Sequence, residues 1–592
     1  GQRRRRTIRA ERRLQLHFGA GQPRRRLICT LGVLLVVFVV VLGKVGLMQT
    51  TRGGALRAAG AQQWSRDRIL PAQRGAIFDR NGDELALSVP ASTIVVNPTQ
   101  VEDPAGTADV FAAILGLTPE RRNELEAAMA AQDSGFLYVA RQVDDTLAEQ
   151  VAALRLVGVL TYREDRRMLP GGATARSIVG DTDIDGRGIS GIELQYNRVL
   201  RGREGSATLD VAPGGRSVAG TEQVVQAPVA GDDLVLSIDR SVQYATEQAL
   251  LRRVAATGAR GGQAIVMDTD TGDIIAMASV RINDDGVYEI TSGNFSAVDA
   301  YEPGSVGKVI TISAALEERS VQTDTSFMVP WREWYSDRYL SDSHEHPTEP
   351  LTVHQILVES SNIGTIKVGQ TMSYETQYEY MRAFGLGDQT ALDFPGESAG
   401  ILHPWQTWEG TEKYTVYYGQ GVASSPIQLV SAVNTIANDG VYVAPRLVSA
   451  TVADDGELID ADPSATHRVI SERTATTMQQ LMKDVVCDGT ATRAQVEGMS
   501  IAGKTGTGYK AQANGTYFND DGSRAYYASF VGFFPAEDPQ VSILVSIDEP
   551  RADSDDRFGG TAAAPVFQEL APTMVHELGI EQPAGSTGCT GE

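Results

Sequence analysis

Residues 302–316 read EPGSVGKVITISAAL, the most informative stretch of this 592-residue chain. Pro303 and Gly304 stand just before an apolar run, which is typical of a helix start and predicts Ser305 in the first turn. Residues three apart share a helix face, so we expect the amine of Lys308 to reach the Ser305 hydroxyl. A serine is a weak nucleophile until a base takes its proton, and a partly desolvated lysine is such a base. The stretch therefore predicts an activated serine, although Ser-x-x-Lys alone also occurs by chance.

Two later motifs indicate that the Ser-x-x-Lys motif does not occur here by chance. Ser360-Ser361-Asn362 follows 55 residues after Ser305 and offers a second hydroxyl for proton relay and an amide for a substrate carbonyl. Lys504-Thr505-Gly506-Thr507 follows small residues and predicts an edge strand, in which Gly506 permits close approach of a substrate backbone. Taken singly, these motifs are more often a helix cap and a surface turn. Three of them in this order, at domain-scale spacing, indicate one catalytic site.

The motif set Ser-x-x-Lys, Ser-x-Asn and Lys-Thr-Gly resembles that of penicillin-binding proteins and serine β-lactamases. The resemblance is closer to the monofunctional, class B penicillin-binding proteins. It extends along most of the chain, over two stretches that look like pedestal motifs and several in the catalytic half: Arg74–Gly82, Gly188–Glu193 with Leu200–Gly202, Asp299–Ser305, Tyr418–Gly421 and Phe558–Gly560. The anchor described below, the chain length and the lack of appended modules are most like the septal cell-division transpeptidases (FtsI type).

A few positions depart from the pattern of this family. Val309 and Ile310 follow Lys308 where a proline is often nearby, and Leu169-Pro170 stands where Tyr-Pro is common. Ser425-Pro426 replaces a usual Thr-Pro. None of these residues is a catalytic group, so they bear on the subtype and leave the chemistry intact.

The resemblance implies acyl transfer to peptidoglycan stem peptides that end in D-Ala-D-Ala. Ser305, deprotonated by Lys308, would attack the carbonyl between the two D-alanines, and Ser360 would pass the proton to the leaving amine. Asn362 would hold the substrate amide. The amine of a neighbouring strand would then complete the cross-link. Which of Lys308 and Ser360 handles the proton at each step stays open.

The same resemblance assigns the binding residues. Lys504, Thr505 and Thr507 would hold the substrate carboxylate beside Gly506, and the backbone N–H groups of Ser305 and Thr507 would form the oxyanion hole. β-Lactams are expected as inhibitors. No cofactor is expected.

A basic tail and an apolar run predict a membrane anchor. Residues 1–26 hold ten Arg and one acid, Glu11, in a chain of net charge −23. From Leu27 to Met48 the chain is apolar except for Lys44, long enough for about 33 Å of helix, which crosses a bilayer core. The positive-inside rule predicts a single-pass protein with its N-terminus in the cytoplasm and its catalytic domain outside. Two other readings stay open: an Arg-rich tail without a role, and a signal peptide cleaved near Ala59–Ala61.

The composition also limits the possible ligands. An acidic body repels phosphate, so no nucleic-acid partner is expected. His344-Glu345-His346 has no cysteine nearby and is expected to be loop rather than a metal site. Cys487 and Cys589 both fall in the predicted exported part, where a disulfide is permitted. Two free thiols are an equally open alternative.

We expect an α+β fold, in which an extended α+β pedestal precedes a transpeptidase domain with an antiparallel sheet flanked by helices. The sequence after the anchor is rich in turn residues, except for a helical, charged stretch from Pro119 to Leu156. From Asp232 onward it predicts long, regular elements. Ser241 is expected to cap a helix that ends at Gly258. The predicted organisation is a cytoplasmic tail, a transmembrane anchor, the pedestal, the transpeptidase domain and a C-terminal tail: residues 1–26, 27–48, 49–225, 226–580 and 581–592. Further strands and a last helix are expected at Leu234–Ile238, Ala264–Asp268, Ile274–Ala278, Phe530–Phe534, Val541–Ser546 and Pro565–Leu578.

Several functions share these motifs. A D,D-carboxypeptidase or β-lactamase has the same three, but neither explains a long pedestal on a membrane anchor. A non-catalytic division scaffold is disfavoured by the intact Ser305, Lys308, Ser360 and Lys504. An elongation-type transpeptidase of the same class is the main rival, because it differs in partners and not in chemistry. The expected partners are a membrane-embedded peptidoglycan glycosyltransferase and other division proteins, reached through the anchor and pedestal.

Overall fold

The computed structural model describes most of the chain: residues 23–51, 54, 64–210, 220–510, 517–519, 522, 524–551, 555–583, 586 and 588–589. The first 22 residues of the predicted basic tail and the candidate cleavage site Ala59–Ala61 lie outside the described residues. The chain divides into two units, one within residues 1–70 and 205–227 and the other within residues 71–204 and 228–592.

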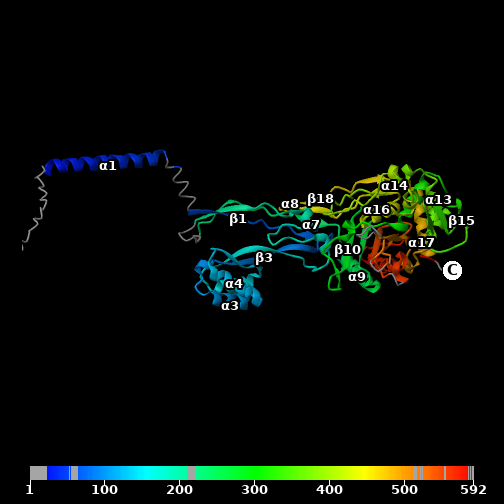
Figure 1. Cartoon of the computed structure of the whole chain (residues 1–592), viewed down its shortest axis with the longest axis horizontal. Helices are drawn as coiled ribbons and strands as arrows, with labels where there is room; N and C mark the ends of the chain where they lie inside the picture. Colours follow the sequence, from blue (N-terminus) through cyan, green and yellow to red (C-terminus); the bar gives the residue numbers. More distant parts are fainter. Residues whose placement is uncertain are drawn as a thin grey trace, which may run out of the picture. The chain divides into compact units, whose positions relative to one another are not determined.

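The first unit contains the predicted anchor and a small sheet. Helix α1 (Pro23–Thr51) includes the whole apolar run, and its apolar side chains are exposed. Among the described residues it is the one helix long and apolar enough to cross a membrane. Strands β1 (Ser65–Leu70), β6 (Gly205–Asp210) and β7 (Gln223–Gln226) form an antiparallel sheet in the order β1-β6-β7 (Figure 1).

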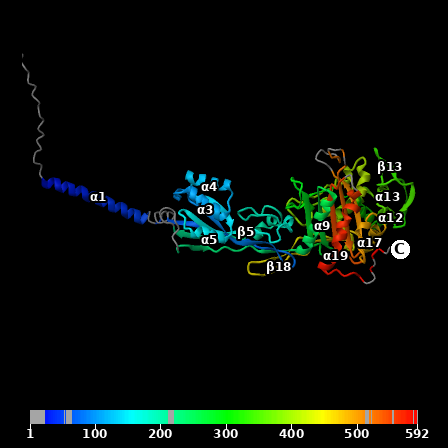
Figure 2. The ribbon, with the colours of Figure 1, turned by 90° about the horizontal axis from the view of Figure 1, so that it is seen from below.

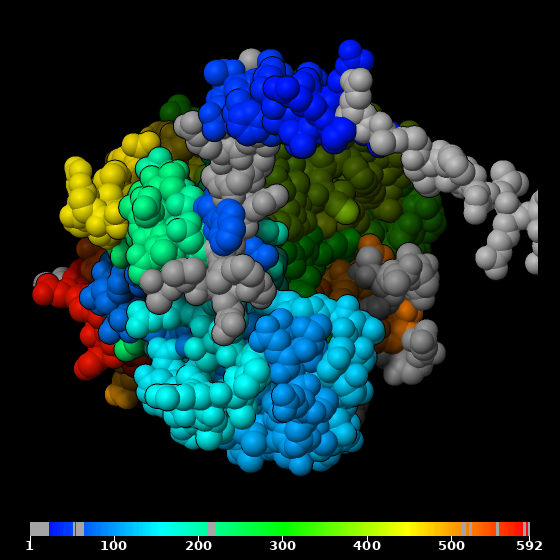
Figure 3. Space-filling view, turned by 90° about the vertical axis from the view of Figure 1, so that its left-hand side faces the viewer, coloured from blue at the N-terminus to red at the C-terminus, as the bar shows by residue number. Residues whose placement is uncertain are grey.

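The second unit begins with a subdomain built on the long strand β3 (Glu84–Val96). Strands β4 (Leu137–Val143) and β5 (Val159–Met168) pair with it, both antiparallel. Three helices, α3 (Pro104–Leu115), α4 (Pro119–Ala131) and α5 (Asp145–Ala153), share a core with its buried Ile94 and Val96. Figure 3 shows this subdomain as one continuous body in blue and cyan.

The expectation of one helical stretch from Pro119 to Leu156 was wrong. Helix α4 ends at Ala131, and Gln132 takes a left-handed φ of 51°. Strand β4 pairs with β3, and it was missed because its sequence LYVARQV, with Arg141 as its one charged residue, lies between two charged helical segments.

The sheet of β3, β4 and β5 continues into segments that are far apart in sequence and has seven strands in all. Strand β2 (Ile77–Phe78) pairs antiparallel with β3 and parallel with β8 (Asp233–Leu236). Strand β8 in turn pairs with β17 (Val448–Val452), which pairs with β18 (Leu458–Asp460). The strand predicted at Leu234–Ile238 is therefore confirmed, and it links the pedestal to the catalytic half of the same unit. Short helices connect the pedestal strands: α6 (Arg176–Val179), α7 (Gly191–Gln195) and α8 (Asn197–Leu200).

The catalytic half is built on a six-stranded antiparallel sheet, which confirms the α+β class. Its order is β11-β10-β9-β22-β21-β20, with β20 at one edge. The bounds are β9 (Gly261–Asp268), β10 (Ile274–Ile282), β11 (Tyr288–Ile290), β20 (Ala502–Tyr509), β21 (Tyr526–Phe534) and β22 (Val541–Asp548). The strands predicted at Ala264–Asp268 and Ile274–Ala278 are confirmed and form the hairpin β9–β10, and the strands predicted at Phe530–Phe534 and Val541–Ser546 are confirmed as β21 and β22.

Helices cover both faces of this sheet. Helices α9 (Arg240–Thr257) and α19 (Ala564–Leu578) lie side by side on one face (Figure 2), where Phe567 packs edge-on against Phe530 and Phe534 of β21. Helix α16 (Pro426–Ala437) lies on the other, where Ser542 of β22 donates to Asn434 at 2.7 Å. The remaining helices of this half are α10 (Phe295–Val298), α11 (Lys308–Glu317), α12 (Val353–Val358), α13 (Asn362–Gly369), α14 (Tyr374–Ala383), α15 (Glu412–Thr415), α17 (Glu472–Cys487) and α18 (Gly559–Ala562).

Two local predictions had different outcomes. The cap of α9 is Asp239 and not Ser241, because the Asp239 carboxylate accepts the N–H groups of Ser241 and Val242 and favours the positive end of the helix. The disulfide is confirmed: Cys487, the last residue of α17, is bonded to Cys589, 102 residues later, with 5.2 Å between their Cα atoms.

Candidate active site

Ser305 lies in a single 3-10 turn, η2 (Gly304–Gly307), which leads directly into α11. The prediction of a serine at a helix start is confirmed. Gly304 has a φ of +55°, and a Cβ there would lie 2.6 Å from the Thr507 carbonyl oxygen. Only glycine combines this backbone conformation with so close an approach, so Gly304 seats the Ser305 turn against β20.

Two buried lysines converge on the hydroxyl of Ser360. Lys308 Nζ lies 3.1 Å from Ser360 Oγ, and Lys504 Nζ lies 2.9 Å from the same oxygen. Lys308 also donates to the Ser360 carbonyl. A hydroxyl oxygen can accept two hydrogen bonds and still donate its own proton. The lysine of Ser-x-x-Lys, the first serine of Ser-x-Asn and the lysine of Lys-Thr-Gly are thus brought together at one hydroxyl.

The amine of Lys308 was expected to contact the Ser305 hydroxyl, but in the structure it contacts Ser360 instead. Within the described part of the chain, the hydrogen bonds of Lys308 Nζ lead to Ser360 and none to Ser305 Oγ. Because a buried amine needs acceptors, the carbonyl and hydroxyl of Ser360 take that role. Sequence spacing along one helix did not reveal the acceptors, since they come from the turn between α12 and α13.

Burial makes both lysines unusually ready to lose a proton. It lowers the pKa of Lys308 to about 7, although the nearby Asp342 carboxylate acts in the opposite direction. Burial also lowers the pKa of Lys504 well below its usual value, and the charge of Lys308 adds to the effect. Both side chains are fully buried. An amine in this pocket can therefore accept a proton near neutral pH.

The strand that carries Lys504 lies at the edge of the sheet, as predicted. Thr505 Oγ1 lies 2.7 Å from Thr490 Oγ1, and Thr507 Oγ1 accepts the Gly559 N–H at 3.4 Å. A Cβ on Gly506 would lie 2.4 Å from Ser529 Oγ and 2.8 Å from the Pro303 carbonyl oxygen. This glycine therefore allows the turn before Ser305 to pack on the strand, in addition to the role expected of it.

A second glycine-rich stretch supports the same turn. Gly419, at φ +79°, has no room for a Cβ, which would lie 2.2 Å from the Gly304 carbonyl oxygen. The Glu302 carboxylate accepts the Gly421 N–H at 3.1 Å and the Tyr517 hydroxyl at 2.9 Å. The stretch Tyr418–Gly421, singled out from the sequence, thus packs directly against the segment that carries Ser305.

Asn362 is the first residue of α13 and is half-buried. Its side-chain amide donates to the Ser341 carbonyl at 2.9 Å, and its backbone N–H donates to Asp342. Asp342 and His346 were missed as site residues because they lie in the loop after residues 338–341, outside the three motifs, and spacing gave no signal for them. Among the described residues, no cluster of three or more His, Cys, Asp or Glu is placed to hold a metal.

Two family matches account for most of the chain. Residues 69–236 match the penicillin-binding protein dimerisation domain, and residues 262–571 match the penicillin-binding protein transpeptidase domain. The chain belongs to the class B penicillin-binding proteins.

Individual relatives agree with this assignment. The penicillin-binding protein PbpB of Mycolicibacterium smegmatis is 33% identical over 92% of this chain and 89% of its own length. The peptidoglycan D,D-transpeptidase FtsI of Escherichia coli K12 is 30% identical over 94% of this chain and 92% of its own. A crystal structure of penicillin-binding protein 3 from Mycobacterium tuberculosis complexed with aztreonam superposes with a TM-score of 0.67 at 28% identity, covering 88% of this chain and all of that one.

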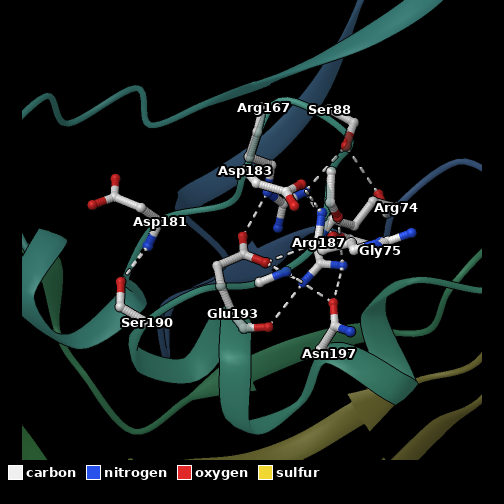
Figure 4. Close-up of polar contacts among 12 residues, drawn as sticks. Arg74, Gly75, Ser88, Arg167, Asp181, Asp183, Arg187, Ser190, Glu193 and Asn197 are labelled. Carbon is white, nitrogen blue, oxygen red and sulfur yellow. Dashed lines mark hydrogen bonds and ion pairs between the residues drawn. The ribbon is translucent and has the colours of Figure 1, made fainter.

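The two pedestal motifs of this class B penicillin-binding protein meet in a buried ion cluster (Figure 4). Arg74 Nε and Arg167 Nε each donate to one oxygen of Glu193, both at 2.7 Å. Arg74 also donates to the Asn197 side chain at 2.9 Å, and Arg167 to the Gly75 carbonyl at 2.8 Å. These contacts tie the segment before β2 to β5 and α7. The sequence motifs therefore hold the pedestal together and contribute no catalytic group.

Proposed function

We propose that this chain is a membrane-anchored peptidoglycan D,D-transpeptidase that cross-links stem peptides through an acyl-enzyme on Ser305 during septal wall synthesis. The observation that carries the proposal is the convergence of two buried lysines, Lys308 and Lys504, on the Ser360 hydroxyl beside the Ser305 turn. The relatives named peptidoglycan D,D-transpeptidase support the substrate class.

In the first step, Ser305 Oγ attacks the carbonyl carbon of the penultimate D-alanine. Lys308 takes the hydroxyl proton, either directly or through Ser360, because its lowered pKa makes the neutral amine available near pH 7. The attack forms the C–O bond and a tetrahedral oxyanion, and collapse of this intermediate breaks the C–N bond as the Ser360 hydroxyl passes a proton to the departing D-alanine amine. The Ser360 hydroxyl then regains a proton from Lys308, and Lys504 holds Ser360 in place during this transfer.

Substrate contacts come from the edge strand and the α13 start. Lys504, Thr505 and Thr507 hold the terminal carboxylate, and Asn362 holds the stem-peptide amide. The backbone N–H groups of Ser305 and Thr507 stabilise the oxyanion, a contribution of about 3–4 kcal/mol when one such donor is removed in comparable enzymes.

In the second step, an amine from a neighbouring stem peptide attacks the ester. The C–O bond to Ser305 breaks, the new amide forms the cross-link, and the proton of the amine returns the serine to its starting form. Atoms therefore balance without a cofactor: one D-alanine leaves for each cross-link made.

Orientation and partners form part of the same proposal. Arg24, Arg25 and Arg26 at the start of α1 favour the cytoplasmic side, which supports an orientation with the pedestal and the catalytic domain outside the cell. Protease added to intact spheroplasts is expected to degrade the catalytic domain. A membrane-embedded glycosyltransferase and other division proteins are the proposed partners, contacted through the anchor and pedestal.

The reaction is tested on the full chain in detergent, supplied with glycan strands polymerised from a lipid-linked precursor. Digestion of the product should yield cross-linked muropeptides, and the Ser305→Ala variant should yield none. D-Alanine release without cross-links would instead identify a carboxypeptidase. Imaging of a tagged chain decides the cellular role: enrichment at the septum supports division, and a side-wall distribution supports the elongation-type alternative.

A further inference from the structure

The buried carboxylate of Asp342 lies at the turn that follows Ser360 and takes no part in the proposed acylation steps. Asp342, which follows strand β14 (Arg338–Ser341), is 7% exposed. Its two oxygens accept four hydrogen bonds, two from backbone N–H groups at the start of α13 and two from side chains. The donors are Asn362 N at 2.5 Å, Ile363 N at 2.9 Å, Ser361 Oγ at 2.7 Å and His346 Nε2 at 3.0 Å.

These contacts fix the backbone that presents Ser360. Ser360 has a φ of +61°, which residues other than glycine seldom adopt unless the surroundings hold them there. The residues that follow it, Ser361 and Asn362, are both tied to Asp342. The carboxylate also sits at the free N–H groups of α13, where negative charge is favourable. The loop that follows β14 therefore holds the turn in its strained form.

We infer that Asp342, itself held by His346, is a positioning residue for the proposed acylation, because it fixes the turn that places the Ser360 hydroxyl between Lys308 and Lys504. The inference rests on the function proposed above. It gives a role to His346, which the sequence placed in an ordinary loop.

The charge of Asp342 has a second effect that a test can separate from the first. The charged side chain that acts on Lys308 is Asp342, which raises the pKa of the amine against the effect of burial, and the charge of Lys308 in turn lowers the pKa of Lys504. For His346, burial opposes protonation, but the hydrogen bonds that the imidazole donates to the Asp342 carboxylate and the Pro347 carbonyl, and the nearby charges of Asp342 and Glu349, raise its pKa overall. Removing the charge of Asp342 must therefore lower the pKa of Lys308.

The test measures acylation of the full chain in detergent by a fluorescent penicillin between pH 5 and 9. Asp342→Asn should lower the second-order acylation rate constant on the order of 10²-fold, the loss typical of a misplaced reacting group. The acid limb of its pH profile should also move to lower pH, because Lys308 loses its proton more readily. Asp342→Glu, which keeps the charge, should leave the limb in place, and His346→Gln should lower the rate less than Asp342→Asn.

A matched control lies two residues from His346. His344 is exposed, so His344→Gln should acylate like the wild type. A purely structural role for Asp342 would lower the melting temperature and the active fraction without moving the pH limb, and that result would overturn the inference. So would an Asp342→Asn variant with the wild-type rate and profile. Failure of the wild type itself to form an adduct would instead refute the proposed function.

Discussion

The buried ion cluster of the pedestal gives a quantitative prediction for stability. In Glu193→Ala the carboxylate that neutralises Arg74 and Arg167 is lost, while both guanidinium groups stay buried. Glu193 is 1% exposed, and the side chains of both arginines are 7% exposed, so water cannot replace the missing charge. Burial already lowers the pKa of Arg167, which shows that its charge is held there at a cost.

The magnitude follows from this geometry. Removing one member of a buried pair costs about 3–5 kcal/mol, because it leaves an uncompensated charge, whereas an exposed pair contributes about 0–1 kcal/mol. The Arg121–Glu124 pair of the same subdomain, at 3.0 Å with both side chains well exposed, provides the matched control. We therefore expect Glu193→Ala to destabilise the pedestal by several kcal/mol more than Glu124→Ala.

The assay is urea unfolding of the full chain in detergent, followed by far-ultraviolet circular dichroism. Glu193→Ala should shift the first transition to clearly lower urea, and Glu193→Gln should fall between it and the wild type because the amide oxygen still accepts one hydrogen bond. If the unfolding free energies of Glu193→Ala and Glu124→Ala differ by less than about 1 kcal/mol, the ion cluster does not hold the pedestal together.

Three further predictions concern the catalytic half. Acylation of the wild type should rise through pH about 7 as Lys308 loses its proton, and a rate independent of pH between 5 and 9 would contradict the role of that amine. Gly304→Ala should lower the acylation rate on the order of 10²-fold, while Gly82→Ala, at a left-handed turn with open space around it, should leave that rate unchanged. Replacing Cys487 and Cys589 by serine should reduce the unfolding free energy by up to ~4.7 kcal/mol in the chain-entropy model, and equal stability with and without the bond would contradict that account.

Much of the fold was predictable because its signals are local. The apolar run of α1, the hairpin β9–β10 and the strands β21 and β22 are each visible as hydrophobic patterns of the right length. Strand β4 was missed because it is a short segment between the charged helices α4 and α5, and its pairing with β3 is not visible in the local sequence.

The candidate site likewise has residues that local motifs predict and contacts that only the tertiary fold creates. Ser305, Lys308, Ser360 and Lys504 were predicted because three motifs coincide in order and spacing, and the structure brings Lys308, Ser360 and Lys504 together. The link from Lys308 to Ser360 was not predictable, since it depends on how the turn between α12 and α13 folds back on α11. Asp342 was hidden for the same physical reason: its partners lie about 20 residues away in sequence and are brought to it only by the tertiary fold.

The central claim is that Ser305 and Lys308 act as one unit in acyl transfer. Mass spectrometry of the full chain after exposure to a β-lactam tests it most directly, because the drug mimics the D-Ala-D-Ala amide. We predict one covalent adduct on the peptide that contains Ser305 and none in Ser305→Ala. Lys308→Ala should acylate slower by orders of magnitude, and the double variant should be scarcely worse than either single one, since groups that act together give non-additive losses. An adduct on another serine, or normal acylation of Lys308→Ala, would contradict the account.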